Sequence, residues 1–327
     1  MKFGPVPISD ALGAVLAHSV AVPGGRLKKG LVLERKHLSA LSDAGLSELT
    51  VARLDPEDVA EDAAATRVAA AICGQGLRAS VATTGRVNLI AEGPGIVDVD
   101  ADRVAALNRV DPMITLATLR PWKQVAAGGM VATVKVISYG VADDAVQAAC
   151  EAGQGALSLR TPVVSQAGLI QTTFGADDGV KGHRVLSERL VRLDVTLGAN
   201  TIVPHSVDAL ANALKMAAGE VLFILTGSAT SDLHDVAPEA LRAAGGIVHH
   251  FGMPVDPGNL LFLGALDGRP VIGLPGCARS PALNGADWVM ERILCGVPVT
   301  PGDIAAMGVG GLLKDIPQRG RMRDRQA

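Results

Sequence analysis

The chain has 327 residues, which is long enough for two or three domains that each bury their own core. Its net charge of -3 argues against a duplex nucleic-acid binder, because such a protein needs a basic face. An aromatic content of 2% also leaves too few rings for a base-stacking surface or a sugar-binding platform. We therefore expect recognition through backbone amides and small polar groups.

The cysteines and the N-terminal residues indicate a cellular location. The four cysteines are far apart and form no Cys-x-x-Cys pair, so we expect neither a disulfide framework nor a zinc site. The N-terminal residues include Pro5, Pro7 and Asp10, and they lack the unbroken apolar region of a signal peptide. No stretch approaches the ~20 apolar residues of a membrane helix. These features predict a cytoplasmic protein that does not bind a membrane.

The first part of the chain predicts a small α/β unit at about residues 1–72. Apolar residues at helical spacing favour a short amphipathic helix within 8–20 and a second helix at 35–44. Residues 46–54 should return as a strand. An Ala-rich segment at 57–72 begins with acidic residues, which favours a helix with negative charge at its positive end.

The middle of the chain, about residues 73–155, predicts a β-rich region. Two β-branched runs punctuated by glycine, at 87–100 and 128–137, flank a predicted helix at 101–108 with Asp100 as its N-cap. A further helix ending near Gly153 precedes the expected domain boundary. Residues 1–155 together therefore form the expected N-terminal mixed α/β region.

Helices and short apolar runs alternate over residues 156–300, which predicts an α/β domain with a doubly wound, mainly parallel sheet. In such a sheet, ligands bind at the carboxyl ends of the strands. We expect residues 301–327 to form a flexible tail. The expected strands are 168–173, 200–204, 221–225, 247–251, 260–266 and 269–274. The expected helices include one with Leu186, Leu190, Leu193 and Leu197 on one face, one capped by Ser206, and a last one ending near Leu294.

A turn of small and hydroxylated residues follows the predicted strand 221–225. Its members let backbone N–H groups and hydroxyls approach an anion closely. If Pro238 is the first helical position, Ala237 would be the N-cap, and alanine caps poorly. Asp235 then either caps the helix or takes part in the chemistry, and the sequence leaves both readings open. The turn consists of Thr226, Gly227, Ser228, Ala229, Thr230 and Ser231.

A second turn follows the predicted strand 269–274. Ser280 and Pro281 read as an N-cap and first helical residue, with Gly276 and Arg279 just before them. A helix dipole, free amides, a hydroxyl and a guanidinium would converge there, which suits a phosphate. Ordinary helix capping is the alternative for Ser280. Cys277 lies beside the same helix start, but no His–Cys spacing supports a catalytic thiol.

Histidines in two settings of this half of the chain are candidates for a site. His249 and His250 are adjacent on a predicted strand, so their side chains face opposite sides and do not readily bind one metal together. His205 and His234 lie at predicted strand ends, where an acid/base or hydrogen-bonding role competes with simple exposure in a loop.

The two turns resemble those of the molybdopterin-binding fold shared by molybdopterin adenylyltransferases and molybdopterin molybdenumtransferases. Thr226-Gly227 followed by Asp235 and a Pro-Glu-Ala helix start is similar to the family's TGG turn. The segment 274–280 looks like its LPG-x-P-x-S turn, and 255–259 looks like its K-P-G-K pattern. Residues 11–20 and 38–54 are similar to the opening of the molybdenumtransferases. The resemblance covers about residues 5–55 and 160–295.

The resemblance implies roles for site residues and also shows departures from the pattern. It makes Asp235 the catalytic acid and a Mg²⁺ ligand, and it brings Ser280 to the pterin phosphate. The pterin contacts it implies are Thr226, Gly227, Ser228, Thr230, Gly276, Arg279 and Ser280. The departures are Ser228 and Thr230 for glycines, Asp256 and Asn259 for lysines, Ala278 for proline and His205 for an aspartate. Lost lysines remove positive charge, and a lost aspartate weakens magnesium binding.

The resemblance implies a molybdopterin-binding protein of molybdenum cofactor biosynthesis that transfers molybdate or a nucleotide to the pterin. The altered motifs make a binding, carrier or insertion role an equal reading. The implied partners are a nucleotide, a second copy of the chain, and a nucleotidyltransferase or molybdoenzyme. Two alternatives stay open: a Mg²⁺-dependent nucleotide pyrophosphate hydrolase, and a non-catalytic binding or oligomerisation module.

Overall fold

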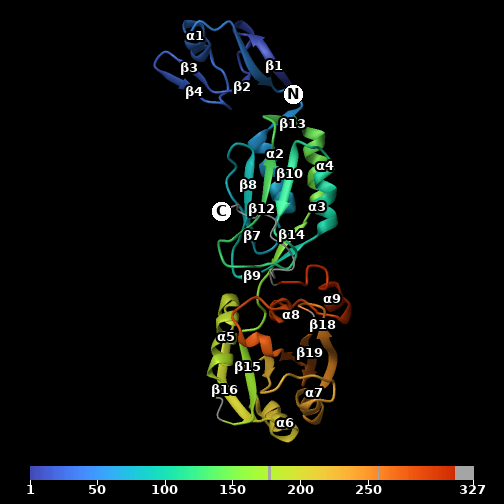
Figure 1. The fold of residues 1–327 in the computed structure, drawn as a ribbon. Helices are drawn as coiled ribbons and strands as arrows, with labels where there is room; N and C mark the ends of the chain where they lie inside the picture. Colours follow the sequence, from blue (N-terminus) through green and yellow to red (C-terminus); the bar gives the residue numbers. More distant parts are fainter. Residues whose placement is uncertain (176–177, 257, 314–327) are drawn as a thin grey trace, which may run out of the picture. The chain divides into compact units, whose positions relative to one another are not determined.

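The computed structural model describes residues 1–175, 178–256 and 258–313 (Figure 1). These residues form two compact units. The first holds Met1–Gly93 and Val97–Leu159, and the second holds Pro94–Ile96 and the described residues from Arg160 onward. Helices and strands occur in both units, so the chain is a mixed α/β protein, as expected.

A small antiparallel sheet of order β1-β5-β2 opens the first unit, and a core that includes Leu16, Leu41 and Val51 lies beneath it. The helix expected within 8–20 is wrong, because only a short 3-10 turn forms there. Gly13 has a φ of +76°, and Val15–Leu16 pairs with β5, so strand pairing decides the conformation. The elements are β1 (Lys2–Pro7), η1 (Ile8–Asp10), β2 (Val15–Leu16), β3 (Val20–Val22), β4 (Gly25–Leu27), α1 (Arg35–Asp43) and β5 (Glu48–Arg53).

The rest of the first unit is rich in strands, and its helix α2 packs against β8 and β12 over an Ala- and Val-rich core. Asp100 caps α3 through a hydrogen bond from the Arg103 N–H at 3.0 Å, which confirms the expected cap. The elements are β6 (Asp58–Ala60), α2 (Glu61–Ile72), β7 (Leu77–Ala79), β8 (Arg86–Ala91), β9 (Gly95–Val99), α3 (Ala101–Asn108), β10 (Ile114–Thr118), β11 (Gln124–Val125), β12 (Met130–Val136), β13 (Gly140–Ala142), α4 (Asp143–Gly153) and β14 (Leu157–Arg160).

A six-stranded sheet of order β16-β15-β17-β20-β19-β18 organises the second unit. Strands β16, β15, β17 and β20 are parallel, and all five residues of β17 are buried. The strands are β15 (Gln166–Thr173), β16 (Thr196–Pro204), β17 (Val221–Leu225), β18 (Ile247–Met253), β19 (Asn259–Leu266) and β20 (Arg269–Leu274).

The sheet is mixed: β16, β15, β17 and β20 form a parallel part, as expected of a mainly parallel sheet, whereas the antiparallel strand β19 departs from a doubly wound parallel arrangement. Strand β19 runs antiparallel to both β18 and β20. The cause is the tight turn between β19 and β20, where Asp267 and Gly268 have φ values of +50° and +75°. Two consecutive residues with positive φ make a hairpin turn whose twist matches the strands, so β20 folds back beside β19. The expected strands 168–173, 200–204 and 221–225 lie in β15, β16 and β17, which belong to the parallel part of the sheet.

Helices cover both faces of this sheet (Figure 1). Helices α6 and α7 pack on Leu222 and Ile224 of β17. On the other face, α5 approaches Leu225 so closely that a Cβ at Gly182 would lie 2.7 Å from that side chain. The helices are α5 (Val180–Leu190), α6 (Val207–Met216), α7 (Val236–Ala243), α8 (Gly285–Leu294) and α9 (Pro301–Ala306), with 3-10 turns η2 (Val191–Leu193) and η3 (Gly276–Arg279).

Two further expectations concern the C-terminal tail and helices that could span a membrane. Helix α9 occupies the start of the segment expected to be a flexible tail, and the rest of that tail, from residue 314, lies outside the described residues. Within the described ranges, every helix is too short or too polar to cross a bilayer.

The chain path diverges at the carboxyl ends of two neighbouring strands. The chain leaves β15 toward α5 on one face, whereas it leaves the adjacent β17 toward α7 on the other face. Ligands of open α/β sheets bind where neighbouring connections diverge in this way. The carboxyl ends of β15 and β17 are therefore the place to look for a site.

Candidate functional site

Three strand ends meet through one buried threonine at this edge of the sheet. Thr172, at the end of β15, is 2% exposed, and its Oγ1 accepts the Gly227 N–H at 2.9 Å. The same oxygen lies 2.7 Å from Nδ1 of His205, which follows β16. Gly227 must stay small, because a Cβ there would lie 2.8 Å from the Thr172 carbonyl oxygen. His205, expected from the sequence to lie at a strand end, is thus joined to the first turn.

The turn after β17 presents backbone donors. Thr226 and Thr230 are buried, with their hydroxyl oxygens 3.3 Å apart, and they hold the turn closed from within. Ser228 and Ala229 are exposed between them. The N–H groups of Ser228, Ala229 and Thr230 find no acceptor among the residues that the structure describes. Such unpaired amides in a turn are suited to an anion.

Asp235 is the N-cap of α7, which begins at Val236, two residues before the expected start at Pro238. Its Oδ1 accepts the Val236 N–H at 2.7 Å, and its Oδ2 accepts the Ser231 N–H at 2.9 Å. Burial alone would raise the pKa of Asp235, but these hydrogen bonds and the nearby His205 lower it overall. Both carboxylate oxygens already stabilise the turn and the helix start, so the geometry favours the capping role.

The second turn touches the first. Residues Gly276–Arg279 form the 3-10 turn η3 directly after β20, and Nη2 of Arg279 donates to the Thr226 carbonyl at 2.9 Å. Gly276 and Cys277 are exposed, and Arg279 is half-buried. The structure therefore brings Thr226, Gly227, Ser228, Thr230, Gly276 and Arg279 to one edge of the sheet.

Ser280 does not cap a helix, which corrects the expected helix start. Helix α8 begins at Gly285, and Asn284 is its N-cap. Asn284 and Asp287 form a reciprocal capping box, since the Asn284 N–H donates to the Asp287 carboxylate at 2.8 Å. Ser280 is an exposed loop residue whose Oγ accepts the Ala282 N–H at 3.3 Å. The helix dipole invoked at Ser280 is therefore absent from that position.

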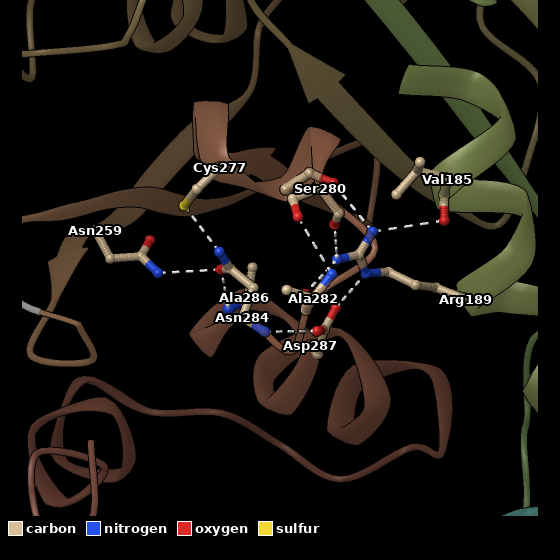
Figure 2. A network of polar contacts seen from close by, with 10 residues as sticks. Val185, Arg189, Asn259, Cys277, Ser280, Ala282, Asn284, Ala286 and Asp287 are labelled. Atoms are coloured by element: carbon tan, nitrogen blue, oxygen red, sulfur yellow. Dashed lines mark hydrogen bonds and ion pairs between the residues drawn. The ribbon is translucent and has the colours of Figure 1, made fainter. Parts of the chain in front are cut away.

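A buried arginine holds the loop between η3 and α8 (Figure 2). Arg189 of α5 is 8% exposed, and its Nε donates to Oδ1 of Asp287 at 2.6 Å. Arg189 was not identified from the sequence. It lies on the same helix face as the apolar residues Val185, Leu186 and Leu190, and an arginine in that position predicts a buried ion-pair partner. Its other donors reach carbonyls of Ala278 (3.0 Å), Val185 (3.5 Å), Ser280 (2.7 Å) and Ala282 (3.1 Å).

An amide chain supports η3 from the opposite side (Figure 2). Oδ1 of Asn284 accepts hydrogen bonds from the Ala286 N–H at 3.0 Å and from Nδ2 of Asn259 at 3.2 Å. These two donors fix the orientation of the Asn284 amide, so its Nδ2 donates to the Cys277 sulfur at 2.8 Å. Asn259, which replaces a lysine of the resembled pattern, is 5% exposed and serves this scaffold.

The described residues do not fit a dedicated magnesium site. No group of three or more His, Cys, Asp or Glu side chains within the described ranges is arranged to hold a metal ion. Asp235, the expected ligand, is committed to capping. Two histidines considered in the sequence lie apart from Asp235 in other contacts: Nδ1 of His234 is 2.8 Å from a Glu239 carboxylate oxygen, and Nε2 of His250 is 2.7 Å from the Gly252 carbonyl oxygen. We therefore derive no step through magnesium.

A cavity of about 290 Å³ lies elsewhere in this unit, along the amino-terminal half of β15 and the end of α6. Its walls are mostly glycine and alanine, with the exposed Met216 at the rim. It holds neither a charged side chain nor any residue of the two turns. The chemistry therefore points to the strand ends and not to this cavity.

Comparison with known proteins adds a partial match. A family model described as "Domain of unknown function (DUF8806)" matches residues 5–53, within the first unit. No curated protein matches the chain. Among solved structures, the molybdopterin biosynthesis moea protein from Pyrococcus horikosii is 14% identical, covering 90% of this chain and 75% of its own, with a TM-score of 0.32. Molybdenum cofactor biosynthesis protein B is also 14% identical, covering 42% of this chain and 96% of its own, with a TM-score of 0.32. At these TM-scores, neither likeness carries an argument about fold or function.

Proposed function

We propose that the chain binds molybdopterin by its phosphate end, at the strand edge formed by residues 226–230 and 276–279, as a binding protein of molybdenum cofactor biosynthesis. The observation that carries the proposal is the contact between the turns, in which Arg279 donates to the Thr226 carbonyl at 2.9 Å. The two segments that resemble the pterin-binding turns are separate in the sequence. Their contact at the carboxyl ends of the neighbouring strands β17 and β20 is what one shared site requires.

The electrostatics of this edge suit a phosphate. Arg279 uses one nitrogen for the Thr226 carbonyl, and no other acceptor for its guanidinium lies among the described residues. The remaining N–H groups are therefore available to a phosphate, which guanidinium binds in a forked geometry. The unpaired amides of Ser228, Ala229 and Thr230 add neutral donors on the neighbouring turn. An anion held between the turns would satisfy both sets.

The geometry supports binding more than metal-dependent catalysis. Asp235 would have to give up its helix-capping and turn-closing hydrogen bonds to ligate an ion freely. The described residues offer no cluster of acidic side chains to replace it. A carrier or insertion role therefore follows more directly from this site than transfer of molybdate or a nucleotide.

The experiment that tests this proposal is an anaerobic titration of the full chain with molybdopterin and with the same pterin after removal of its phosphate. We expect saturable binding of the phosphorylated pterin only. Arg279→Ala should weaken it about tenfold or more, because a charge-assisted hydrogen bond to the ligand is lost. Arg184→Ala is the matched control, since Arg184 pairs with Glu188 on the exposed face of α5. Equal affinity for both pterins would refute the proposal, as would the absence of binding.

A further inference from the structure

The ring of His205 is held in one place by the buried hydroxyl of Thr172. Nδ1 of His205 lies 2.7 Å from Oγ1 of Thr172. The backbone of His205 is also fixed, because its N–H donates to the Thr173 carbonyl at 2.9 Å. The Phe174 ring packs against the imidazole with centroids 4.4 Å apart and the planes at 47°. The contact with Thr172, the backbone hydrogen bond to Thr173 and the packing of the Phe174 ring together restrict the motion of the imidazole.

The protons of the contact between Thr172 and His205 can be assigned from hydrogen-bond accounting. Oγ1 of Thr172 already accepts the Gly227 N–H at 2.9 Å. Because Thr172 is 2% exposed, its hydroxyl proton needs an acceptor inside the protein. Among the described residues the acceptor within reach is Nδ1 of His205. Nδ1 therefore accepts, and the proton of the neutral ring resides on Nε2.

The opposite nitrogen is the one available to a ligand. Nε2 of His205 has no partner among the residues that the structure describes, and the side chain is half-buried at the edge where Gly227 begins the first turn. A neutral ring with its proton on Nε2 donates a hydrogen bond there and has no lone pair to act as a base. Of the two roles that the sequence left open for His205, this arrangement favours hydrogen bonding over acid/base chemistry.

We propose that His205 is a specificity-determining residue of the pterin site, which donates a hydrogen bond from Nε2 to a phosphate oxygen of the ligand. The ligand contact rests on the proposed function, whereas the ring tautomer does not. Thr172 is the positioning residue, because it selects the tautomer without touching the ligand. The Gly227 N–H, by donating to Thr172, ties this arrangement to the turn that holds the amide donors.

The tautomer is tested without any ligand. Heteronuclear NMR spectra of the imidazole nitrogens, recorded at about pH 8.5 and so well above the usual histidine pKa of about 6.5, report which nitrogen carries the proton. We expect the Nε2–H form in the wild type and in Thr172→Ser, which keeps the hydroxyl. Thr172→Val, which removes it, should give a mixture of tautomers. An Nδ1–H ring in the wild type would overturn the assignment.

The ligand contact is tested by pterin affinity. His205→Gln offers an amide donor at a similar reach, so we expect it to bind phosphorylated molybdopterin within about threefold of the wild type, whereas His205→Leu should lose about tenfold or more. Unchanged affinity in His205→Leu would overturn the contact and leave the proposed function intact. If the wild type binds no pterin while the ring is in the Nε2–H form, the proposed function and the contact both fail, and only the tautomer assignment stands.

Discussion

Replacing Arg189 with methionine should destabilise the second unit strongly. The substitution keeps a long apolar side chain but leaves Asp287 buried without its cation, at a site where the pair is 2.6 Å apart and the two side chains are 8% and 10% exposed. Removing one partner of a buried pair costs about 3–5 kcal/mol, which we take as the expected loss in free energy of unfolding. The carbonyl groups of Ala278 and Ser280 also lose their donor.

The assay is urea unfolding followed by fluorescence of Trp288, which lies in α8 one residue after Asp287. All variants carry Trp122→Phe, so that Trp288 alone reports. Arg184→Ala removes an exposed pair one turn away on the same helix and should cost about 0.5 kcal/mol or less. Amide exchange should also rise in residues 278–287 of Arg189→Met. If Arg189→Met costs no more than Arg184→Ala, the reasoning about this network is wrong.

Three further predictions follow from the site. Asp235→Ala should cost about 1 kcal/mol as a lost N-cap. Asp235→Asn should cost less, because its amide oxygen still accepts the Val236 N–H although its Nδ2 cannot accept the Ser231 N–H, and it should keep pterin affinity. The pKa of Asp235 is lower in the folded protein than its usual value of about 4, so the charged carboxylate stabilises the fold above that pH. This contribution is lost as the pH falls through the folded-state pKa. Asp235→Asn should therefore flatten the acid limb of a plot of unfolding free energy against pH. Gly227→Ala should cost about 1–3 kcal/mol in urea unfolding, since the added Cβ would lie 2.8 Å from a backbone oxygen, while Gly276→Ala, with nothing within 4 Å, should be tolerated; equal losses would contradict the contact. Brief alkylation of the native protein, read by mass spectrometry, should modify the exposed Cys277 and spare Cys295, because burial raises the pKa of the Cys295 thiol to about 12; early labelling of Cys295 would contradict its burial.

Local signals in the sequence predicted much of the second unit. The apolar run at Val221–Leu225 is a fully buried strand, and Ser206 caps α6 as expected, with its Oγ accepting the Ala209 N–H at 3.4 Å. The pair of strands on either side of Asp267-Gly268 also forms. These features depend on residues close together in the sequence, so composition and spacing are enough to find them.

Features that depend on distant contacts could not be predicted in this way. Leu197 was assigned to a helix but lies in β16, because pairing with Ala167 of β15 decides its conformation. Helix α8 was expected to begin after Ser280 but begins at Gly285. The capping box of Asn284 with Asp287, together with the Arg189 contacts, stabilises this start more than a lone serine cap would stabilise the other. A serine before a proline looks like a helix start in the sequence, and a partner nearly a hundred residues away is not visible there.

In the candidate site, too, the sequence predicted the local features but not the contacts between distant residues. The two turns were found from their small residues and from the resemblance, but their contact through Arg279 and Thr226 needed the fold. The role of Asp235 was left open between capping and chemistry, and the positions of Ser231 and Val236 around its carboxylate favour capping. Thr172 carried no signal at all, because one threonine at the end of an apolar strand is ordinary until the neighbouring strands are in place.

The proposed site requires that the two turns bind one pterin phosphate together. The most direct measurement is a map of backbone amide chemical shifts of the full chain during titration with molybdopterin. We expect the amides of Ser228, Ala229 and Thr230 and those of residues 276–279 to shift in parallel, with one midpoint, and dephosphorylated pterin to leave them unchanged. Shifts confined to a single turn, or to the alanine-lined cavity along β15, would contradict it.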